Sequence, residues 1–582
     1  PAQHADLDVE VYGRDKLDQV QQQLRDQPGV TVLVYQQMCA TELRRRRKRN
    51  LVADDKPRVL INSEVCEDCG DCTAVSQCVA IEPVATPMGN KRQVNQTSCN
   101  KDLSCADGFC PAFVTVKGEL RKTEVAQDDD QLETLRQQLP APQVDGDTAD
   151  LLLAGVGGTG IVTVSALLAA AAQIEGKAVR TLDMTGLAQK GGAVFAHVRL
   201  GCELAPRIPA AGADAVLACD LVSAATEEAL HLLHKGTRVF VNSHVMPTAE
   251  YVLQANADNQ ARQRMKRLRM LCPDTQVVDA VASVTALLGD ATQTNVLMLG
   301  FAYQNGVVPL AVASIEAALR SNGTQVRQNQ LAFHVGRQLA LQATAGVVQP
   351  APAGVRAGNA QLPPAEDLPA VLNRLRQHLY AYQGEALVMQ FNNVLERVAA
   401  AEAAHKPGSE LLTRAVAESL ARVLTPKDEF EVARLHGGDA FMRTLQGQFA
   451  PGARVNYLLA PPLLGKRKRN FGPWMQPVFR LLARCKSLRN TWLDPFRFTA
   501  DRRLDLALAA DFISLVDQML TNLSLQNLPI AVSLAKLPMA VRGFGHIKAA
   551  RYGEMQAQQA KMWTEFVTPP QVVQLFEPRH AA

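Results

Sequence analysis

Residues 65–78 read VCEDCGDCTAVSQC, and residues 98–111 read SCNKDLSCADGFCP, so that seven of the chain's twelve cysteines fall in two short stretches. The first group has the spacing Cys66-x2-Cys69-x2-Cys72. A single tight loop with this spacing can place three sulfurs on three corners of an iron–sulfur cube. Zinc sites instead combine two-cysteine knuckles separated by a dozen or more residues. The spacing therefore favours an iron–sulfur cluster over zinc.

The remaining cysteines of these stretches predict a second cluster. In two-cluster ferredoxins the fourth ligand is a distant cysteine followed by proline, and each motif lends its fourth cysteine to the other cluster. Cys110, which precedes Pro111, fits the fourth position of the first cluster. Cys78 is then expected to join Cys99 and Cys105 around the second cluster.

One thiolate is missing from this second set. Equal spacing gives Cys99-x2-Asp102-x2-Cys105, so Asp102 stands where the middle cysteine of the triplet would be. A carboxylate can bind iron, although it is a harder and more labile ligand than a thiolate. We expect a four-iron cluster with an oxygen ligand or a three-iron cluster; the alternatives are a plain loop aspartate, or Cys39 as eighth ligand. The isolated cysteines are expected to be packing residues: Cys202, Cys219, Cys272 and Cys485.

Length and composition point to a multidomain protein of ordinary globular type. The chain has 582 residues, of which 47% are hydrophobic and 20% charged, and its net charge is only +4. This balance does not suggest nucleic-acid binding. We find no apolar run long enough for a membrane helix and no signal peptide, which predicts a cytoplasmic protein without disulfides. Because the chain begins at Pro1, it is expected to be a fragment or a processed piece.

Shifts in composition predict four parts of a multidomain α/β protein. Residues 1–50 resemble the end of a βαβ unit, with strands expected at 8–12 and 28–37. The cysteine region follows, then an alternation of short apolar strands and helices that predicts a mainly parallel, doubly wound sheet. The last third is expected to be mainly helical. The boundaries of the other three parts are 58–120, 148–345 and 366–582.

A glycine loop, GVGGTG, follows a strand and opens a helix in the third part. Its glycines permit a tight turn with amides aimed at an anion; they are Gly155, Gly157, Gly158 and Gly160. Asp183 ends the next strand, near the place of a ribose-binding carboxylate. The residues leave open NAD or flavin, a phosphate-bearing group such as coenzyme A, and a structural turn. Lys190 could contact substrate or coenzyme A, the alternative being a solvent-exposed lysine beside a turn.

Several stretches together resemble one family. The cysteine region, the segment LLLAGVGGTGIVTVSALLAAAA and, in the last third, KDEFEVARLH, FGPWMQPVFRLLA and RGFGHIK closely resemble the fused bacterial indolepyruvate (arylpyruvate) ferredoxin oxidoreductases. The resemblance covers essentially the whole chain, as the carboxy-terminal portion of such an enzyme. Residues 1–45 resemble only the tail of the thiamine-binding domain.

The resemblance implies an enzyme that decarboxylates a 2-oxoacid oxidatively on thiamine diphosphate and Mg²⁺. Electrons would pass through a ferredoxin-like two-cluster module to an external ferredoxin, and the acyl group to coenzyme A. It also implies a gamma-type domain at 148–345, which argues against NAD. The Gly-Asp-Gly thiamine signature is absent from this sequence, so thiamine is expected on a preceding part or a partner chain. A homodimer of the full assembly is expected.

Two basic runs, Arg44–Arg49 and Lys466–Arg469, complete the candidates. A run of like charge is most often a solvated linker. The sharper hypothesis is that they dock an acidic ferredoxin, since opposite charges speed encounter. Two other functions stay open on the residues: a flavin- or NAD-linked iron–sulfur electron-transfer subunit, and a zinc-stabilised nucleic-acid-binding protein.

Overall fold

The computed structural model describes residues 10–49, 51–54, 56–121, 129–144, 146–185, 192–203, 205–246, 260–344, 366–461 and 468–568. The chain forms two compact units, Pro1–Asp55 and Lys56–Ala582. The first unit contains a short 3-10 helix, η1 (Arg14–Lys16), and two helices, α1 (Leu17–Arg25) and α2 (Ala40–Lys48).

The structure corrects the prediction of strands in the first unit. The predicted strand at 28–37 is irregular, and so are residues 10–12 of the strand predicted at 8–12, whose first residues lie outside the described part. Val30 and Val34 are 97% and 83% exposed. A strand is stable only with a hydrogen-bonded neighbour, and the described residues of this unit include no strand with which either segment could pair. Residues 28–37 therefore carry the apolar pattern of a strand but do not form one.

The cysteine region folds around two small sheets. Its elements are β1 (Arg58–Ile61), α3 (Asp71–Ser76), β2 (Ile81–Thr86), β3 (Gly89–Val94), η2 (Ser104–Ala106) and β4 (Phe113–Lys117). β2 and β3 form an antiparallel hairpin. β1 pairs with β4, and this sheet continues through β11 (Arg454–Leu459) and β12 (Arg469–Phe471) in the order β1-β4-β11-β12. The last third therefore completes the sheet of the cysteine region, which sequence reasoning did not anticipate.

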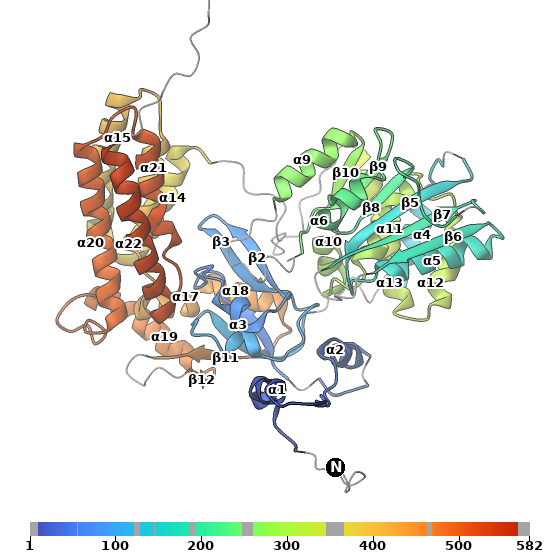
Figure 1. Ribbon diagram of the computed structural model, residues 1–582, viewed down its shortest axis with the longest axis horizontal. Coiled ribbons are helices and arrows are strands. Elements are labelled where there is room, and N and C mark those ends of the chain that lie inside the picture. Colours follow the sequence, from blue (N-terminus) through green and yellow to red (C-terminus); the bar gives the residue numbers. More distant parts are fainter. Residues whose placement is uncertain are drawn as a thin grey trace, which may run out of the picture. The chain divides into compact units, whose positions relative to one another are not determined.

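The middle of the chain forms the expected α/β domain (Figure 1). Its strands are β5 (Ala149–Val156), β6 (Val179–Met184), β7 (Ala193–Leu200), β8 (Ala215–Ala218), β9 (Arg238–Asn242) and β10 (Thr275–Val278), in the order β10-β9-β8-β5-β7-β6. β10, β9, β8 and β5 are parallel, and β7 runs antiparallel to both β5 and β6. The predicted mainly parallel sheet is confirmed.

Helices cover both faces of this sheet. Successive residues of a strand point to opposite faces, and in β5 Leu151 and Leu153 belong to one buried cluster while Leu152 and Ala154 belong to another. The first face carries α5 (Ile161–Ile174), α10 (Ala280–Leu288), α11 (Thr294–Gln304), α12 (Val312–Ser321) and α13 (Val326–Thr344). The second carries α6 (Leu221–Ala224), α7 (Glu227–Leu230) and α9 (Ala261–Leu271). α4 (Asp129–Gln138) precedes the domain. The sheet is doubly wound, as predicted.

The last third is mainly helical, as predicted, and is here called the helical domain. It contains α14 (Leu368–Gln383), α15 (Glu385–His405), α16 (Leu411–Leu424), α17 (Glu429–Gly437), α18 (Asp439–Gln448), α19 (Met475–Arg484), η5 (Cys485–Leu488), α20 (Ala500–Thr521), α21 (Leu528–Lys536), η6 (Leu537–Ala540) and α22 (Gly545–Val567). α14–α16 and α20–α22 enclose one core. α17–α19 instead pack their apolar side chains on the β1-β4-β11 sheet, and so attach the helical domain to the cysteine region.

Candidate functional site

The four residues predicted to bind the first cluster meet at one place. The side chains of Cys66, Cys69, Cys72 and Cys110 line the same small cavity, together with Phe113 and others. Burial raises the pKa of Cys110 well above that of an ordinary thiol, and the neighbouring Cys69, Cys66 and Cys72 add to it. Burial likewise raises the pKa of Cys69 to about 11. The fold thus brings Cys110 to the same cavity as the three cysteines of the first loop, although it lies 38 positions after Cys72.

Local backbone turns explain how one loop presents three of these thiols. Asp68 and Gly70 adopt left-handed conformations, with φ of 52° and 79°, and the chain then enters α3 with Cys72 in its first turn. The amides of Asp68 and Arg92 each donate to Cys66 Sγ at 3.3 Å. Amide donors favour the charged form of a buried sulfur, so the loop is organised to hold thiolate charge.

The second cysteine loop repeats this backbone. Lys101 and Leu103 have left-handed φ values of 56° and 69°, two and four residues after Cys99, as Asp68 and Gly70 follow Cys66. The Lys101 amide donates to Cys99 Sγ at 3.4 Å, the counterpart of the first loop's bond. A left-handed leucine is unfavourable unless its surroundings impose it, so the loop shape is maintained at a cost. The repeat places Asp102 where the first loop has Cys69.

Asp102 itself is exposed. Its Oδ1 accepts hydrogen bonds from the Ser104 amide at 3.2 Å and from Ser104 Oγ at 3.0 Å. Burial raises the pKa of Cys105 to about 12, and Cys99, Cys78 and the Asp102 carboxylate add to it. Cys78, Cys99 and Cys105 belong to one apolar cluster, while their role as ligands and that of Asp102 stay predictions.

The donor set fits iron–sulfur groups. In the described part of the chain, no three His, Cys, Asp or Glu side chains converge on a point where they could hold one metal ion. Cys66, Cys69, Cys72 and Cys110 all line one cavity, which offers four cysteines to a cluster that takes one thiolate at each corner. The twelve cysteines, all described, form no disulfide.

Basic residues that sequence reasoning missed surround the first loop. Lys91 and Lys427 each donate to Cys66 O, at 2.9 and 3.0 Å. Lys427 also pairs with Glu67 at 3.0 Å, and Arg422 forms a further ion pair with Glu67. Burial, then the charge of Lys427, lowers the pKa of Lys91 to about 7. The segment KDEFEVARLH, which begins with Lys427, is the part of the sequence that could have indicated this contact.

The glycine loop has the hydrogen bonds of a structural turn. The Gly157 amide donates to Gly192 O at 2.9 Å and the Thr159 amide to Val156 O at 3.2 Å. Asn295 Nδ2 donates to Thr159 O at 3.0 Å. Two amides that could face a phosphate are thus engaged within the protein, which favours the structural-turn alternative. A cofactor role for Gly155, Gly157, Gly158 and Gly160 stays a prediction, and Lys190 lies outside the described residues.

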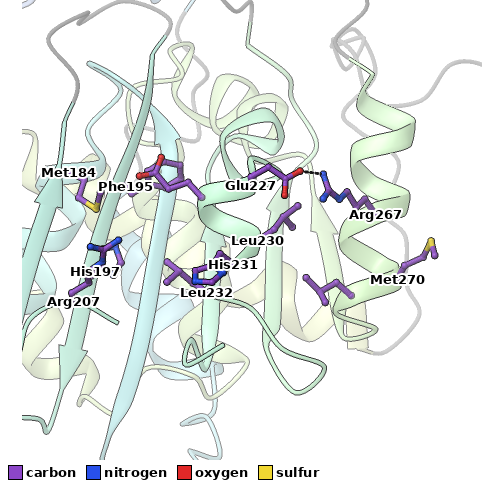
Figure 2. A pocket seen from close by; sticks show the side chains of 12 residues that line it. Met184, Phe195, His197, Arg207, Glu227, Leu230, His231, Leu232, Arg267 and Met270 are labelled. Atoms are coloured by element: carbon purple, nitrogen blue, oxygen red, sulfur yellow. Dashed lines mark hydrogen bonds and ion pairs between the residues drawn. The ribbon is translucent and has the colours of Figure 1, made fainter. Parts of the chain in front are cut away.

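A pocket of about 830 Å³ lies on the second face of the α/β sheet, beside α7 and α9 (Figure 2). Apolar side chains such as Phe195 line it together with His197 and Arg207. His197 Nδ1 accepts the Ile208 amide at 3.1 Å, and burial lowers the pKa of His197. The sequence carried no motif that predicted this pocket.

The second basic run, Lys466–Arg469, was expected to be a solvated linker, and the structure contradicts this for Lys468. Lys468 is not a solvated linker residue: its Nζ donates to Ala106 O and Gly108 O, both at 2.7 Å. Lys466 and Arg467 lie outside the described residues. In the first run, Arg46 pairs with Glu42 along α2 at 3.3 Å.

Among the described residues, no helix combines the length and apolarity needed to span a bilayer.

Known proteins match two parts of the chain. The pyruvate ferredoxin/flavodoxin oxidoreductase family matches residues 150–339, and a family of unknown function (DUF6537) matches residues 368–561. The indolepyruvate oxidoreductase subunit IorB of Archaeoglobus fulgidus is 30% identical over 174 residues, which is 29% of this chain and 84% of that protein. The Pyrococcus horikoshii IorB is 28% identical over 197 residues, 32% of this chain and 93% of that protein.

Solved structures also match about a third of the chain. Pyruvate oxidoreductase subunit PORC from Thermotoga maritima is 20% identical with a TM-score of 0.26, and the match covers 33% of this chain and 97% of that one. The 2-oxoglutarate:ferredoxin oxidoreductase from Magnetococcus marinus is 17% identical with a TM-score of 0.27, covering 37% of this chain and 34% of that one. On the curated relatives and the family match, the chain belongs to the indolepyruvate ferredoxin oxidoreductase type of 2-oxoacid oxidoreductases.

Proposed function

We propose that this chain is the electron-conducting and gamma-type portion of a thiamine-dependent arylpyruvate:ferredoxin oxidoreductase. The complete enzyme would convert a 2-oxoacid such as indolepyruvate to an acyl-coenzyme A and CO₂, with electrons delivered to ferredoxin. The observation that carries this proposal is the repeated cysteine loop beside a domain that matches the oxidoreductase family. Iron–sulfur clusters bound there would supply one-electron transfer.

The residues of the chain have separate tasks in this proposal. Cys66, Cys69, Cys72 and Cys110 would hold one cluster, and Cys78, Cys99 and Cys105 a second, with Asp102 as the candidate eighth ligand. Both loops contribute cysteines to one apolar cluster, in which Cys66, Cys72, Cys105 and Cys110 are buried and Cys78 and Cys99 are partly buried. Cys72 of the first set and Cys105 of the second belong to the same buried cluster, so electrons could pass between the two sets within this module.

Thiamine chemistry does not fit the residues of this chain. The sequence contains no Gly-Asp-Gly motif, and we derive no decarboxylation step from its side chains. A thiamine-binding part or partner subunit must supply that chemistry, which agrees with relatives that are themselves named as subunits. Coenzyme A would be bound either at the glycine loop or on that partner.

Metal and sulfide analysis of anaerobically purified chain tests the proposal. We expect iron and acid-labile sulfide in nearly equal amounts, with each of Cys66→Ser and Cys99→Ser losing a different part of the iron. Cys485→Ser, outside both loops, is the control and should keep all of it. Zinc without sulfide would refute the proposal, and oxidation of NAD(P)H by a bound flavin would support the electron-transfer subunit instead.

A further inference from the structure

The segment RGFGHIK, residues 542–548, runs directly over the first cysteine loop. Arg542 Nη1 donates to Asp68 Oδ2 at 2.8 Å, and its Nε donates to Met539 O at 2.9 Å, which fixes the guanidinium. Gly543 has φ of 105°, and a Cβ built there would lie 3.2 Å from Cys69 Cβ. The absence of a side chain at Gly543 therefore permits this close approach to a predicted cluster ligand.

The same segment also contacts the loop of the remote cysteine. Gly545 has φ of 54°, and a Cβ there would lie 2.5 Å from the Phe109 ring. The rings of Phe109 and His546 meet edge to face with centroids 5.7 Å apart. Phe109 precedes Cys110, so one short segment of the helical domain holds both stretches that supply the first four ligands.

The helical domain brings a surplus of positive charge to this loop. Arg551 Nη2 donates to Cys69 O at 3.2 Å, and Lys427 donates to Cys66 O at 3.0 Å. With Arg422 and Arg542, that makes four cations from the helical domain, against the Glu67, Asp68 and Asp71 carboxylates of the loop. The cysteine region itself adds Arg92, which pairs with Asp68.

The second loop has a different balance. Lys101 lies within that loop, and Asp102 adds a carboxylate whose charge acts on Cys99 and Cys105. Lys468 of the helical domain lies between the two sites, because its Nζ donates to Ala106 O and Gly108 O, which follow Cys105 and precede Cys110. The positive surplus therefore belongs to the first site. Reduction adds negative charge, so nearby buried cations raise a reduction potential.

We propose that the helical domain, the region matched by a family of unknown function, holds the first cysteine loop in place. We also propose that it raises the reduction potential of the cluster bound there. Arg542, Arg551 and Lys427 hold the loop closed against the Cys110 stretch. They also give the group bound by the first four cysteines a higher reduction potential than the group at Cys78, Cys99 and Cys105. The helical domain thereby orders the two electron carriers. This inference rests on the proposed function, because it concerns the clusters proposed there.

Redox titration of the anaerobically purified full chain, followed by electron paramagnetic resonance, tests this proposal. In Arg542→Gln and Arg551→Gln, loss of one cation should make reduction of one centre about tenfold less favourable, a fall of about 59 mV for a one-electron couple. The other centre should be unchanged. Arg397→Gln is the matched control, because Arg397 pairs with Asp517 on the exposed side of the helical domain, and it should shift neither centre.

Iron retention under a chelator provides the second measurement. Faster loss of iron from one centre in Arg542→Gln, with the other retained, would also support this proposal. Unchanged potentials and unchanged retention would overturn it, and so would equal loss from both centres, which would indicate general unfolding. Absence of redox-active centres from the unsubstituted chain would refute the proposed function itself, so the two failures are distinguishable.

Discussion

Two helices of the α/β domain, the buried α11 and the partly buried α13, cross at reciprocal glycines. A Cβ at Gly300 would lie 2.0 Å from Phe333 O, and a Cβ at Gly336 would lie 2.1 Å from Leu297 O. Every residue of α11 is buried, so neither helix can move into solvent without exposing core. Gly300→Ala therefore tests whether this crossing holds the domain together.

The magnitude follows from the contact. Carbon–oxygen approaches below about 3 Å are repulsive, so the helices must separate by about 1 Å at the crossing. Overpacking of this kind costs about 1–3 kcal/mol or more, and replacing glycine in a helix returns about 1 kcal/mol. Because the approach is so close, we take the upper end of about 3 kcal/mol, which leaves a net loss of about 2 kcal/mol for Gly300→Ala. Gly336→Ala should add less than its own cost, because the helices are already separated.

Native-state hydrogen exchange is the suitable assay, because a chain of several domains has no single unfolding free energy. Amides of α11 and α13 should exchange about thirtyfold faster in Gly300→Ala, as should those of the glycine loop, which Asn295 of α11 contacts at Thr159. Gly553→Ala in α22 is the control, since a Cβ there meets nothing within 4 Å. Unchanged exchange of α11 in Gly300→Ala would refute the reasoning.

Two further predictions concern the cysteine region. His436 donates from Nε2 to Pro111 O at 3.0 Å and faces the Asn62 amide group with Nδ1 at 3.3 Å, and burial lowers its pKa from 6.5 to about 4. The neutral His436 ring stabilises the folded state fully above pH 6.5, and about 3 kcal/mol of the free energy of unfolding is lost as the pH falls to 4. Hydrogen exchange of the β4 amides should accelerate accordingly. In His436→Gln this dependence on pH should be much weaker. Asp102→Cys should convert one centre to a plain four-iron spectrum and shift its potential; an unchanged electron paramagnetic resonance spectrum would argue against ligation by Asp102.

Local spacing carried the predictions that held. Cys66, Cys69 and Cys72 are close because six residues of loop cannot separate them far, and the strands β5–β10 could be expected because short apolar runs need the interior of a sheet. The strand predicted at 28–37 failed for a physical reason: its pattern is local, whereas its hydrogen-bonding partner is not. Lys468 was misjudged in the same way, since composition does not show which carbonyls a lysine reaches.

By itself, the sequence predicted the candidate ligands, the equivalence in spacing of Asp102 with Cys69 and the alternation of strands and helices in the α/β domain, because these depend on neighbours along the chain. Only the tertiary structure decided that β11 and β12 complete the sheet of the cysteine region, and that Arg542 and Gly543 lie against Asp68 and Cys69. Those contacts join residues more than 300 positions apart. They arise from packing and charge pairing across the folded chain, which no periodicity or spacing along it encodes.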